Sequence, residues 1–271
     1  MTTASGLPVG RVGFGAMRLP AAPGPAREQA LAVVRRAVGL GVPLIDTAFL
    51  YGWGANEELL AEALHPYPEG LLVATKVGIV PSEEGEGWAH DGRPEKLRRQ
   101  TEQALRRLRL DRVELLQLHR LDPAVPVAEQ VGALRELRDA GLVGGIGLSE
   151  VTVEQLTEAR RTAAIASVQN RYNLFDREHE AVLAQCEAAG IAFLPWRPVA
   201  AERSAEVDAV ARELGATPQQ VLLAWLLARS PVMLPIPGTA SAAHLEENVA
   251  AGALRLTDDL RARLDRAAAG A

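Results

Sequence analysis

The feature that most constrains the fold is a regular alternation of short apolar runs with longer amphipathic stretches along all 271 residues. Each run has the length of a strand and is mostly apolar, which is typical of strands buried on both faces of a parallel sheet. The predicted strands are Arg11–Phe14, Pro43–Ile45, Leu71–Thr75, Val113–Leu118, Val143–Leu148, Ala166–Val168, Ile191–Leu194 and Val232–Pro235.

The stretches between these runs have the period and the ends of helices. Thr152 with Gln155, and Thr217 with Gln220, are capping boxes at two helix starts. The remaining boundaries follow from Pro in first turns and Gly after last turns. We expect helices at Arg27–Leu40, Asn56–Leu64, Pro94–Leu108, Val127–Ala140, Thr152–Arg161, Glu178–Ala189, Ala205–Leu214, Ser241–Ala250 and Asp258–Ala267, with another beginning after Thr217.

Eight strand–helix units, spaced by about 32 residues on average, predict an α/β fold of the (β/α)8 TIM-barrel type. No linker or shift in composition divides the chain, so we expect a single domain over residues 1–271. The alternative is a doubly wound open sheet, which usually has a Gly-rich turn after its first strand. Residues 13–17 do not provide that turn.

Composition excludes several classes of partner. The 29 basic and 34 acidic residues leave a net charge of −5, which offers no surface for nucleic acid. The apolar runs are too short to span a membrane. The five histidines lack ligand spacing and there is one cysteine, so no metal site is predicted. We expect a monomer or a weak homo-oligomer that acts on a small molecule.

Two features favour a cytoplasmic location. The single cysteine, Cys186, permits no internal disulfide and suits a reducing compartment. Residues 1–6 lack the basic and apolar regions of a signal peptide.

Polar or chemically capable side chains stand at the ends of six predicted strands. In a barrel, the carboxyl ends of the strands carry the chemistry. Each residue alone has another explanation, such as a turn cap, a solvated strand end or a core histidine. Their recurrence at equivalent positions favours one shared site, composed of Asp46, Lys76, His119, Ser149, Gln169 and Trp196.

Tyr51 follows Asp46 by five residues, on the loop over the predicted barrel mouth. Its ring could simply pack on that loop. As a proton donor it would need a pKa below its usual value near 10. Lys76 can provide the cation that lowers this pKa, and Asp46 can keep the lysine charged. His119 can hydrogen-bond the substrate oxygen or complete the proton network.

Several segments together resemble the aldo-keto reductase family. Residues 41–52 with 56–57 are similar to its first signature, 72–76 to its lysine strand and 115–119 to its histidine strand. Residues 146–149 and 168–170 resemble its nicotinamide contacts, and 235–248 its segment for the cofactor phosphate and adenine. The motifs occur in family order from about residue 8 onward.

The resemblance implies an NADPH-dependent reduction of an aldehyde or ketone to an alcohol, with NADH as the alternative cofactor. It implies a catalytic tetrad of Asp46, Tyr51, Lys76 and His119, in which Tyr51 protonates the carbonyl oxygen as hydride arrives. It also implies cofactor contacts from Gly15, Ala16, Met17, Asp46, Ser149, Gln169, Trp196, Arg197, Pro198, Gly238, Thr239, Ser241, His244, Glu247 and Asn248.

The chain departs from the family pattern at the cofactor. Many relatives have a lysine at the position of Gly238 and an arginine at that of His244, so the preference for NADPH should be weaker here. Glu150 follows Ser149 where asparagine is common. The loop at residues 200–203 is short, which predicts an exposed cofactor that exchanges rapidly.

Residues 77–93 should shape the substrate pocket, with Trp88 and His90 as candidate walls, although this Gly- and Glu-rich loop could simply be mobile. Two other functions are open. Lys76 could form a Schiff base, as in aldolases. The chain could also be a regulatory subunit that binds the cofactor and turns over slowly.

Overall fold

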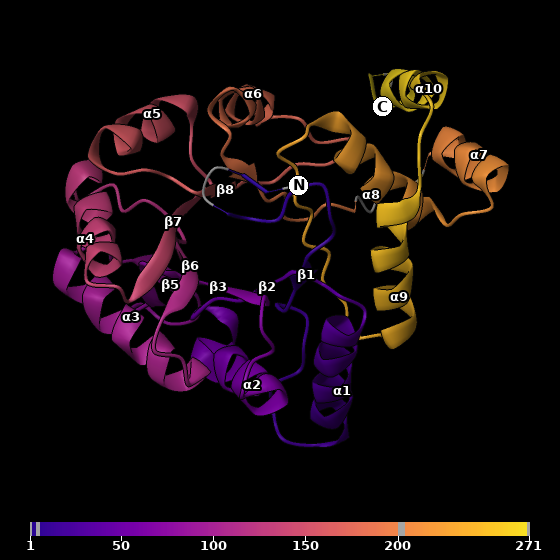
Figure 1. Ribbon diagram of the computed structural model, residues 1–271. Helices are drawn as coiled ribbons and strands as arrows, with labels where there is room; N and C mark the ends of the chain where they lie inside the picture. The colour runs from indigo at the N-terminus through magenta and orange to yellow at the C-terminus, as the bar shows by residue number, and fades with distance from the viewer. Residues whose placement is uncertain (1, 4–5, 200–203, 270–271) are drawn as a thin grey trace.

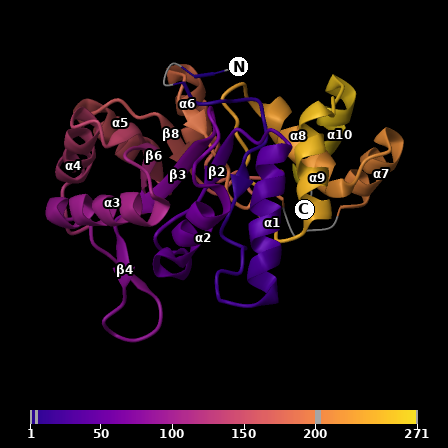
Figure 2. The same cartoon turned by 60° about the horizontal axis from the view of Figure 1, so that its bottom comes forward.

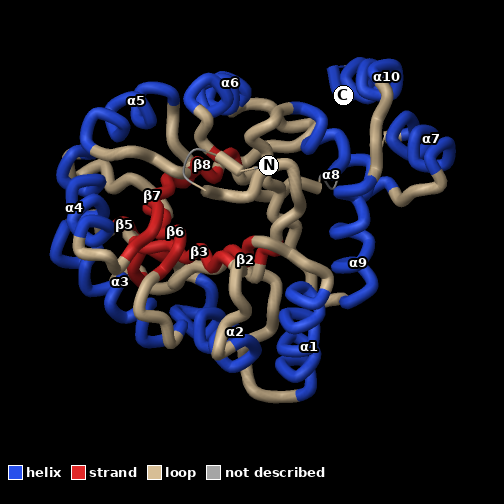
Figure 3. The backbone as a smooth tube through the Cα atoms, in the orientation of Figure 1, coloured by secondary structure: helices blue, strands red, loops and turns tan. Residues whose placement is uncertain are grey.

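Parallel strands curl around a central axis, and helices surround them (Figures 1 and 3). The structure, a computed structural model, describes residues 2–3, 6–199 and 204–269. Within these residues, seven strands form one sheet in the spatial order β1 (Phe14–Gly15), β2 (Leu44–Asp46), β3 (Leu72–Val77), β6 (Val113–Leu118), β7 (Val143–Ser149), β8 (Ser167–Gln169) and β9 (Ala192–Phe193). Neighbouring strands pair in parallel and in chain order. The predicted barrel class is confirmed.

The eighth predicted run closes the barrel without forming a regular strand. Isolated parallel bridges join Met233 to Phe193 of β9 and Gly238 to Gly15 of β1. Pro235 and Pro237 have no backbone N–H, so this segment cannot donate the hydrogen bonds of a regular ladder. It accepts them instead, for example through the carbonyl oxygen of Pro237, which lies 3.2 Å from the Gly15 nitrogen.

The helices cover the outside of the sheet. They are α1 (Pro25–Gly39), α2 (Ala55–Leu64), α3 (Pro94–Leu108), α4 (Val127–Asp139), α5 (Val153–Thr162), α6 (Glu180–Ala189), α7 (Ala205–Leu214), α8 (Pro218–Arg229), α9 (Ala242–Ala250) and α10 (Asp258–Ala269). Short 3-10 helices lie at η1 (Tyr51–Gly54) and η2 (Ala251–Ala253). Both predicted capping boxes are present, at Thr152 and at Thr217. Gly190, which follows the last turn of α6, is a left-handed C-cap with φ of 64°.

The segment after β3, predicted as a loop, contains a two-stranded antiparallel hairpin. Its strands are β4 (Ile79–Pro81) and β5 (Trp88–His90). Gly85 and Gly87, with φ of 129° and 116°, provide the backbone geometry that reverses the chain between them. The hairpin projects from the body of the barrel (Figure 2).

The inside of the barrel is filled by aliphatic side chains. One buried cluster includes Leu44 of β2, Ala74 of β3 and Leu115 of β6, and Leu7 and Val9 of the N-terminal segment pack with it. A larger cluster fills the space between sheet and helices. No helix in the described part of the chain is long and apolar enough to cross a membrane.

Candidate active site

The strand ends converge on a cavity of about 840 Å³. Most predicted site residues line it, which confirms that residues far apart in the chain meet at the barrel mouth. The predicted residues in its lining are Gly15, Met17, Asp46, Tyr51, His119, Ser149, Gln169, Trp196, Arg197, Pro198, Gly238, Thr239, His244, Glu247 and Asn248.

Lys76 lies beneath the cavity floor, because its side chain has an exposed fraction of 0%. Its ammonium nitrogen donates to Asp46 Oδ2 at 2.6 Å, to the Thr47 carbonyl oxygen at 2.8 Å and to the Tyr51 hydroxyl at 3.3 Å. An ammonium group has three N–H donors. All three are therefore occupied, and two of the partners, Asp46 and Tyr51, line the cavity.

Asp46 is held by two amides as well as by the lysine. Its Oδ1 accepts the side-chain N–H of Gln117 and of Gln169, each at 2.9 Å. Gln117 was not predicted as a site residue. The signal for it was a buried polar residue two positions before His119, on the same face of the strand. Because Gln169 Nε2 binds Asp46, that amide N–H is committed to the carboxylate rather than free for a cofactor.

The loop that carries Tyr51 is anchored by two buried polar side chains. The hydroxyl of Thr47 donates to Asn56 Oδ1 at 2.6 Å, and Asn56 Nδ2 donates to the Ala16 carbonyl oxygen at 3.0 Å. The Tyr51 nitrogen donates to the Ala48 carbonyl oxygen at 3.1 Å, as the chain enters η1. These bonds fix the position of the phenol relative to the lysine.

Burial raises the pKa of Tyr51, and the positive charge of Lys76 only partly opposes this effect. The expectation of a lowered pKa is therefore wrong, because the phenol is desolvated as well as close to a cation. Burial alone lowers the pKa of Lys76, but the carboxylate of Asp46 and the hydroxyl of Tyr51 more than compensate and raise it. Tyr51 is thus a protonated phenol held against a charged ammonium.

His119 is a neutral imidazole at any working pH. Burial, assisted by the charges of Lys76 and Arg120, lowers its pKa to about 2. Its ring stands perpendicular to that of Tyr51, with 6.1 Å between the centroids. Its Nδ1 is buried without a hydrogen-bond partner among the described residues. His119 can therefore hydrogen-bond a substrate oxygen but cannot serve as an imidazolium acid.

Trp196 is oriented by Glu150. The indole N–H donates to Glu150 Oε1 at 2.5 Å, and the same oxygen accepts the backbone N–H of Arg171 at 2.8 Å. Glu150 has a φ of 55°, an uncommon conformation for a residue other than glycine. The departure from asparagine at this position thus fixes an aromatic ring at the cavity wall.

The far end of the cavity lies at the start of α9. Ser241 caps this helix, accepting the backbone N–H of His244 at 3.4 Å. Gly238 and Gly15 cross so closely that a Cβ on Gly238 would lie 2.8 Å from the Gly15 carbonyl oxygen. A lysine therefore does not fit at Gly238 without movement of the backbone. Arg18, whose Cγ lies 3.9 Å from that Cβ position, instead brings a cation to this end.

Other predicted residues lie elsewhere. Ala16 and Ser241 support the site from outside the lining. The rings of Trp88 and His90 pack against each other on β5, with 5.1 Å between their centroids. Neither residue is among those that line the cavity. The short loop at residues 200–203 lies outside the described residues.

Sequence reasoning missed seven residues of the lining. Arg120 could have been found, because it directly follows the strand-end His119. Three more lie inside the segments that resemble the family, whereas Arg18, Val199 and Gln219 carry no such signal. The seven missed residues are Arg18, Leu50, Arg120, Val199, Gln219, Ile236 and Pro237.

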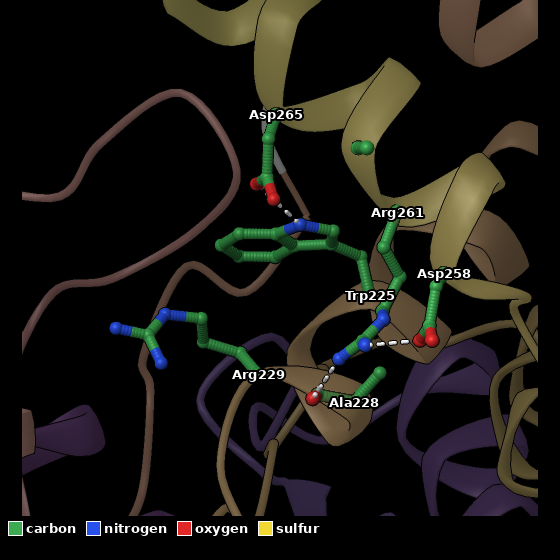
Figure 4. A pocket seen from close by; sticks show the side chains of 7 residues that line it. Trp225, Ala228, Arg229, Asp258, Arg261 and Asp265 are labelled. Carbon is green, nitrogen blue, oxygen red and sulfur yellow. Dashed lines mark hydrogen bonds and ion pairs between the residues drawn. The ribbon is translucent and has the colours of Figure 1, made fainter.

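A second hollow, of about 360 Å³, lies between α8 and α10 on the outside of the barrel (Figure 4). Arg261 there is paired with Asp258, and the indole of Trp225 donates to Asp265 at 3.0 Å (Figure 4). Its other charged groups are also paired, Asp265 with Arg177 and Arg229 with Glu180. Across the described residues, no group of histidine, cysteine and carboxylate side chains could hold a metal ion.

Comparisons with known proteins agree with this geometry. The chain is 43% identical over 265 residues to an uncharacterised oxidoreductase of Schizosaccharomyces pombe, covering 95% of this chain and 86% of the relative. It is 40% identical over 270 residues to pyridoxine 4-dehydrogenase of Escherichia coli, covering 95% and 94%.

Among solved structures, an aldo-keto reductase from Klebsiella pneumoniae in complex with NADPH matches with a TM-score of 0.85 and 28% identity, covering 97% of this chain and 93% of that one. The model of the aldo/keto reductase family matches residues 11–269. The sequence-based resemblance is confirmed, and the chain belongs to the aldo/keto reductase family.

Proposed function

We propose that this protein reduces an aldehyde to an alcohol with Tyr51 as the proton donor and NADPH as the source of hydride. The family assignment makes it an oxidoreductase that reduces carbonyl groups with NADP(H), as the sequence predicted. The observation that carries the residue roles is the buried chain of hydrogen bonds from Asp46 through Lys76 to the Tyr51 hydroxyl. It ends at the floor of the large cavity.

The residues at the far end of the cavity fit a dinucleotide. The first turn of α9 presents backbone N–H groups, which bind phosphate favourably. His244, Asn248 and Arg18 line the same region, and Arg18 offers the fixed positive charge that Gly238 and His244 do not. This arrangement supports NADPH, with NADH as the weaker alternative. Trp196 would form the wall beside the nicotinamide, and the nicotinamide would supply hydride when the cofactor is bound.

The protein's own part in the reaction is proton transfer and charge stabilisation. The Tyr51 hydroxyl donates its proton to the carbonyl oxygen as negative charge develops there. The phenolate left on Tyr51 lies beside the Lys76 ammonium, which stabilises it, and Asp46 keeps that ammonium charged and in place. Neutral His119 orients the carbonyl oxygen by hydrogen bonding. Solvent then returns the proton to Tyr51.

The aldehyde we favour as substrate is pyridoxal, interconverted with pyridoxine. The support is the relative named pyridoxine 4-dehydrogenase, which matches 94% of its own length at 40% identity. A Schiff base on Lys76 is disfavoured, because all three N–H donors are engaged and the ammonium remains protonated.

The test is NADPH oxidation with pyridoxal and with benzaldehyde, comparing the wild type with Tyr51→Phe. Removing one general acid should lower kcat about 10²- to 10⁴-fold. NADPH binding, measured by protein fluorescence, should be unchanged. Unaltered turnover in Tyr51→Phe would refute the role of Tyr51. Binding of NADPH without turnover of any aldehyde by the wild type would instead favour a regulatory subunit.

We also propose that residues 1–271 form a single domain that acts in the cytoplasm as a monomer or weak homo-oligomer. Burial raises the pKa of the Cys186 thiol to about 12, so this cysteine is an unreactive core residue that suits a reducing compartment. Sedimentation equilibrium at micromolar concentration measures the oligomeric state.

A further inference from the structure

One cation at the cavity floor has no carboxylate partner within the part of the chain that the structure describes. Arg120 follows His119 at the end of β6 and lines the cavity together with Tyr51. Its Nη1 donates to the His119 carbonyl oxygen at 2.6 Å and to the Ser149 hydroxyl at 3.1 Å. Among the described residues, its Nε and Nη2 have no hydrogen-bond partner, and no carboxylate forms an ion pair with it. Neither nitrogen is fully buried.

Lys76 and His119 leave no unpaired charge beside Arg120. Lys76 is paired with Asp46 at 2.6 Å, and His119 is neutral. The carboxylate of Glu150 acts on Arg120 electrostatically but forms no ion pair with it, and its Oε1 accepts two N–H groups on the side of Trp196. Among the described residues, the Arg120 guanidinium therefore lies at the cavity floor with no carboxylate bound to it directly.

This cation is also partly desolvated. Burial lowers the pKa of Arg120, although an arginine side chain stays charged at any working pH. Arg120 and Tyr51 line the same cavity, and the positive charge of Arg120 acts on the pKa of the Tyr51 phenol, beside which the reacting carbonyl must lie. A partly buried guanidinium with two free N–H-bearing nitrogens is suited to bind an oxyanion in a forked geometry.

We propose that Arg120 binds an oxyanion of the substrate beside the reacting carbonyl, and so selects aldehydes that carry one. The inference rests on the proposed carbonyl reduction and narrows its substrate class. The ring phenolate of pyridoxal, which is adjacent to the aldehyde, has this chemistry. Arg120 is thus a specificity residue, whereas Tyr51 performs the proton transfer.

Two other roles for Arg120 make different predictions. If the guanidinium only ties the end of β6 to Ser149 of β7, its loss should reduce the turnover of all aldehydes equally. If it contacts the cofactor instead, its loss should weaken NADPH binding in the absence of any aldehyde.

The experiment compares Arg120→Met, Arg120→Lys and a control, Arg112→Met, with the wild type. Arg112 is exposed and precedes the same strand at its other end, where it pairs with Glu114. The substrates are pyridoxal, its 3-O-methyl ether, which cannot form the phenolate, and benzaldehyde. Steady-state NADPH oxidation gives kcat and KM, and protein fluorescence gives the Kd of NADPH.

We expect Arg120→Met to lower kcat/KM for pyridoxal about 10- to 100-fold, mainly through KM, as for the loss of a hydrogen bond to a charged group. The ether and benzaldehyde should change less than threefold, and the Kd of NADPH should not change. Arg120→Lys should recover most of the activity with pyridoxal. Arg112→Met should behave as the wild type.

An equal loss with all three aldehydes, or a weaker Kd for NADPH, would overturn the subsite while leaving carbonyl reduction intact. Failure of the wild type to reduce any of the three with NADPH would overturn the proposed function itself. The two failures are therefore distinguishable.

Discussion

Replacing Asp46 with Asn tests whether Lys76 is charged because of its carboxylate partner. In the folded protein, Asp46 Oδ2 lies 2.6 Å from the lysine nitrogen. Asn can still accept from Gln117 and Gln169 through Oδ1, but its NH₂ group faces the ammonium where Oδ2 was. The substitution thus keeps the size of the side chain but leaves the buried Lys76 ammonium without its counter-ion. It also places two hydrogen-bond donors, the Asn NH₂ group and the ammonium, against each other.

The magnitude follows from the burial of Lys76. In the wild type, the pKa of Lys76 in the folded state lies above the ordinary 10.5. The stability that the charged lysine contributes is therefore complete below pH 10.5 and is lost as pH rises through the folded-state pKa. Without the carboxylate, burial dominates and the pKa falls below 10.5. If Lys76 is neutral in the folded variant at pH 7, the free energy of unfolding decreases by about 5 kcal/mol, at 1.36 kcal/mol per pKa unit. That limit agrees with about 3–5 kcal/mol for breaking a buried pair.

The assay is urea unfolding at pH 7, 8, 9 and 10. The difference in unfolding free energy between the wild type and Asp46→Asn should shrink by up to about 1.4 kcal/mol per pH unit, because the unfolded variant then binds more protons than the folded one. The double variant Asp46→Asn/Lys76→Met, which removes the buried cation, should be more stable at pH 7 than Asp46→Asn alone. A difference that is below 1 kcal/mol and independent of pH would refute the reasoning.

Three further predictions concern other parts of the molecule. Glu57→Gln should lower the unfolding free energy by about 3 kcal/mol in urea, because the buried carboxylate accepts from Thr75 at 2.5 Å and pairs with Arg107 at 2.6 Å. In the wild type, His119 should lower the unfolding free energy by about 1.4 kcal/mol between pH 7.5 and 5.5, because it stays neutral in the folded state and is protonated below pH 6.5 in the unfolded chain. His119→Gln should remove this loss. The same loss in the variant as in the wild type would contradict the prediction. Arg18→Met should raise the fluorescence-measured Kd of NADPH roughly 10-fold and that of NADH less than threefold. Equal changes would show that Arg18 does not contact the phosphate that NADPH has and NADH lacks.

Local sequence information was sufficient for the barrel and for most of the site. Strand-length apolar runs and capping boxes report the conformation of neighbouring residues, so their alternation predicted the elements and their order. The polar residue after each run predicted the site, because parallel strands in a barrel bring their carboxyl ends to one face. Asp46 and His119 meet for this reason.

Local information was not sufficient where the outcome depended on residues distant in the chain. The prediction of a regular eighth strand was wrong, because isolated bridges such as Gly15–Gly238 close the barrel. Pro235 and Pro237 interrupt the hydrogen-bond ladder that a regular strand would form. The hairpin at β4 and β5 was missed because its residues lack a strong alternating pattern.

The electrostatics of the site depended on burial, which only the assembled barrel determines. Motifs placed Tyr51 near Lys76, but desolvation decided that the phenol keeps a raised pKa, and the same burial keeps His119 neutral. The order of residues predicted which groups meet. The packing around them, through the removal of water and the choice of hydrogen-bond partners, decided their charge and left Arg120 without a carboxylate partner in the described part of the chain.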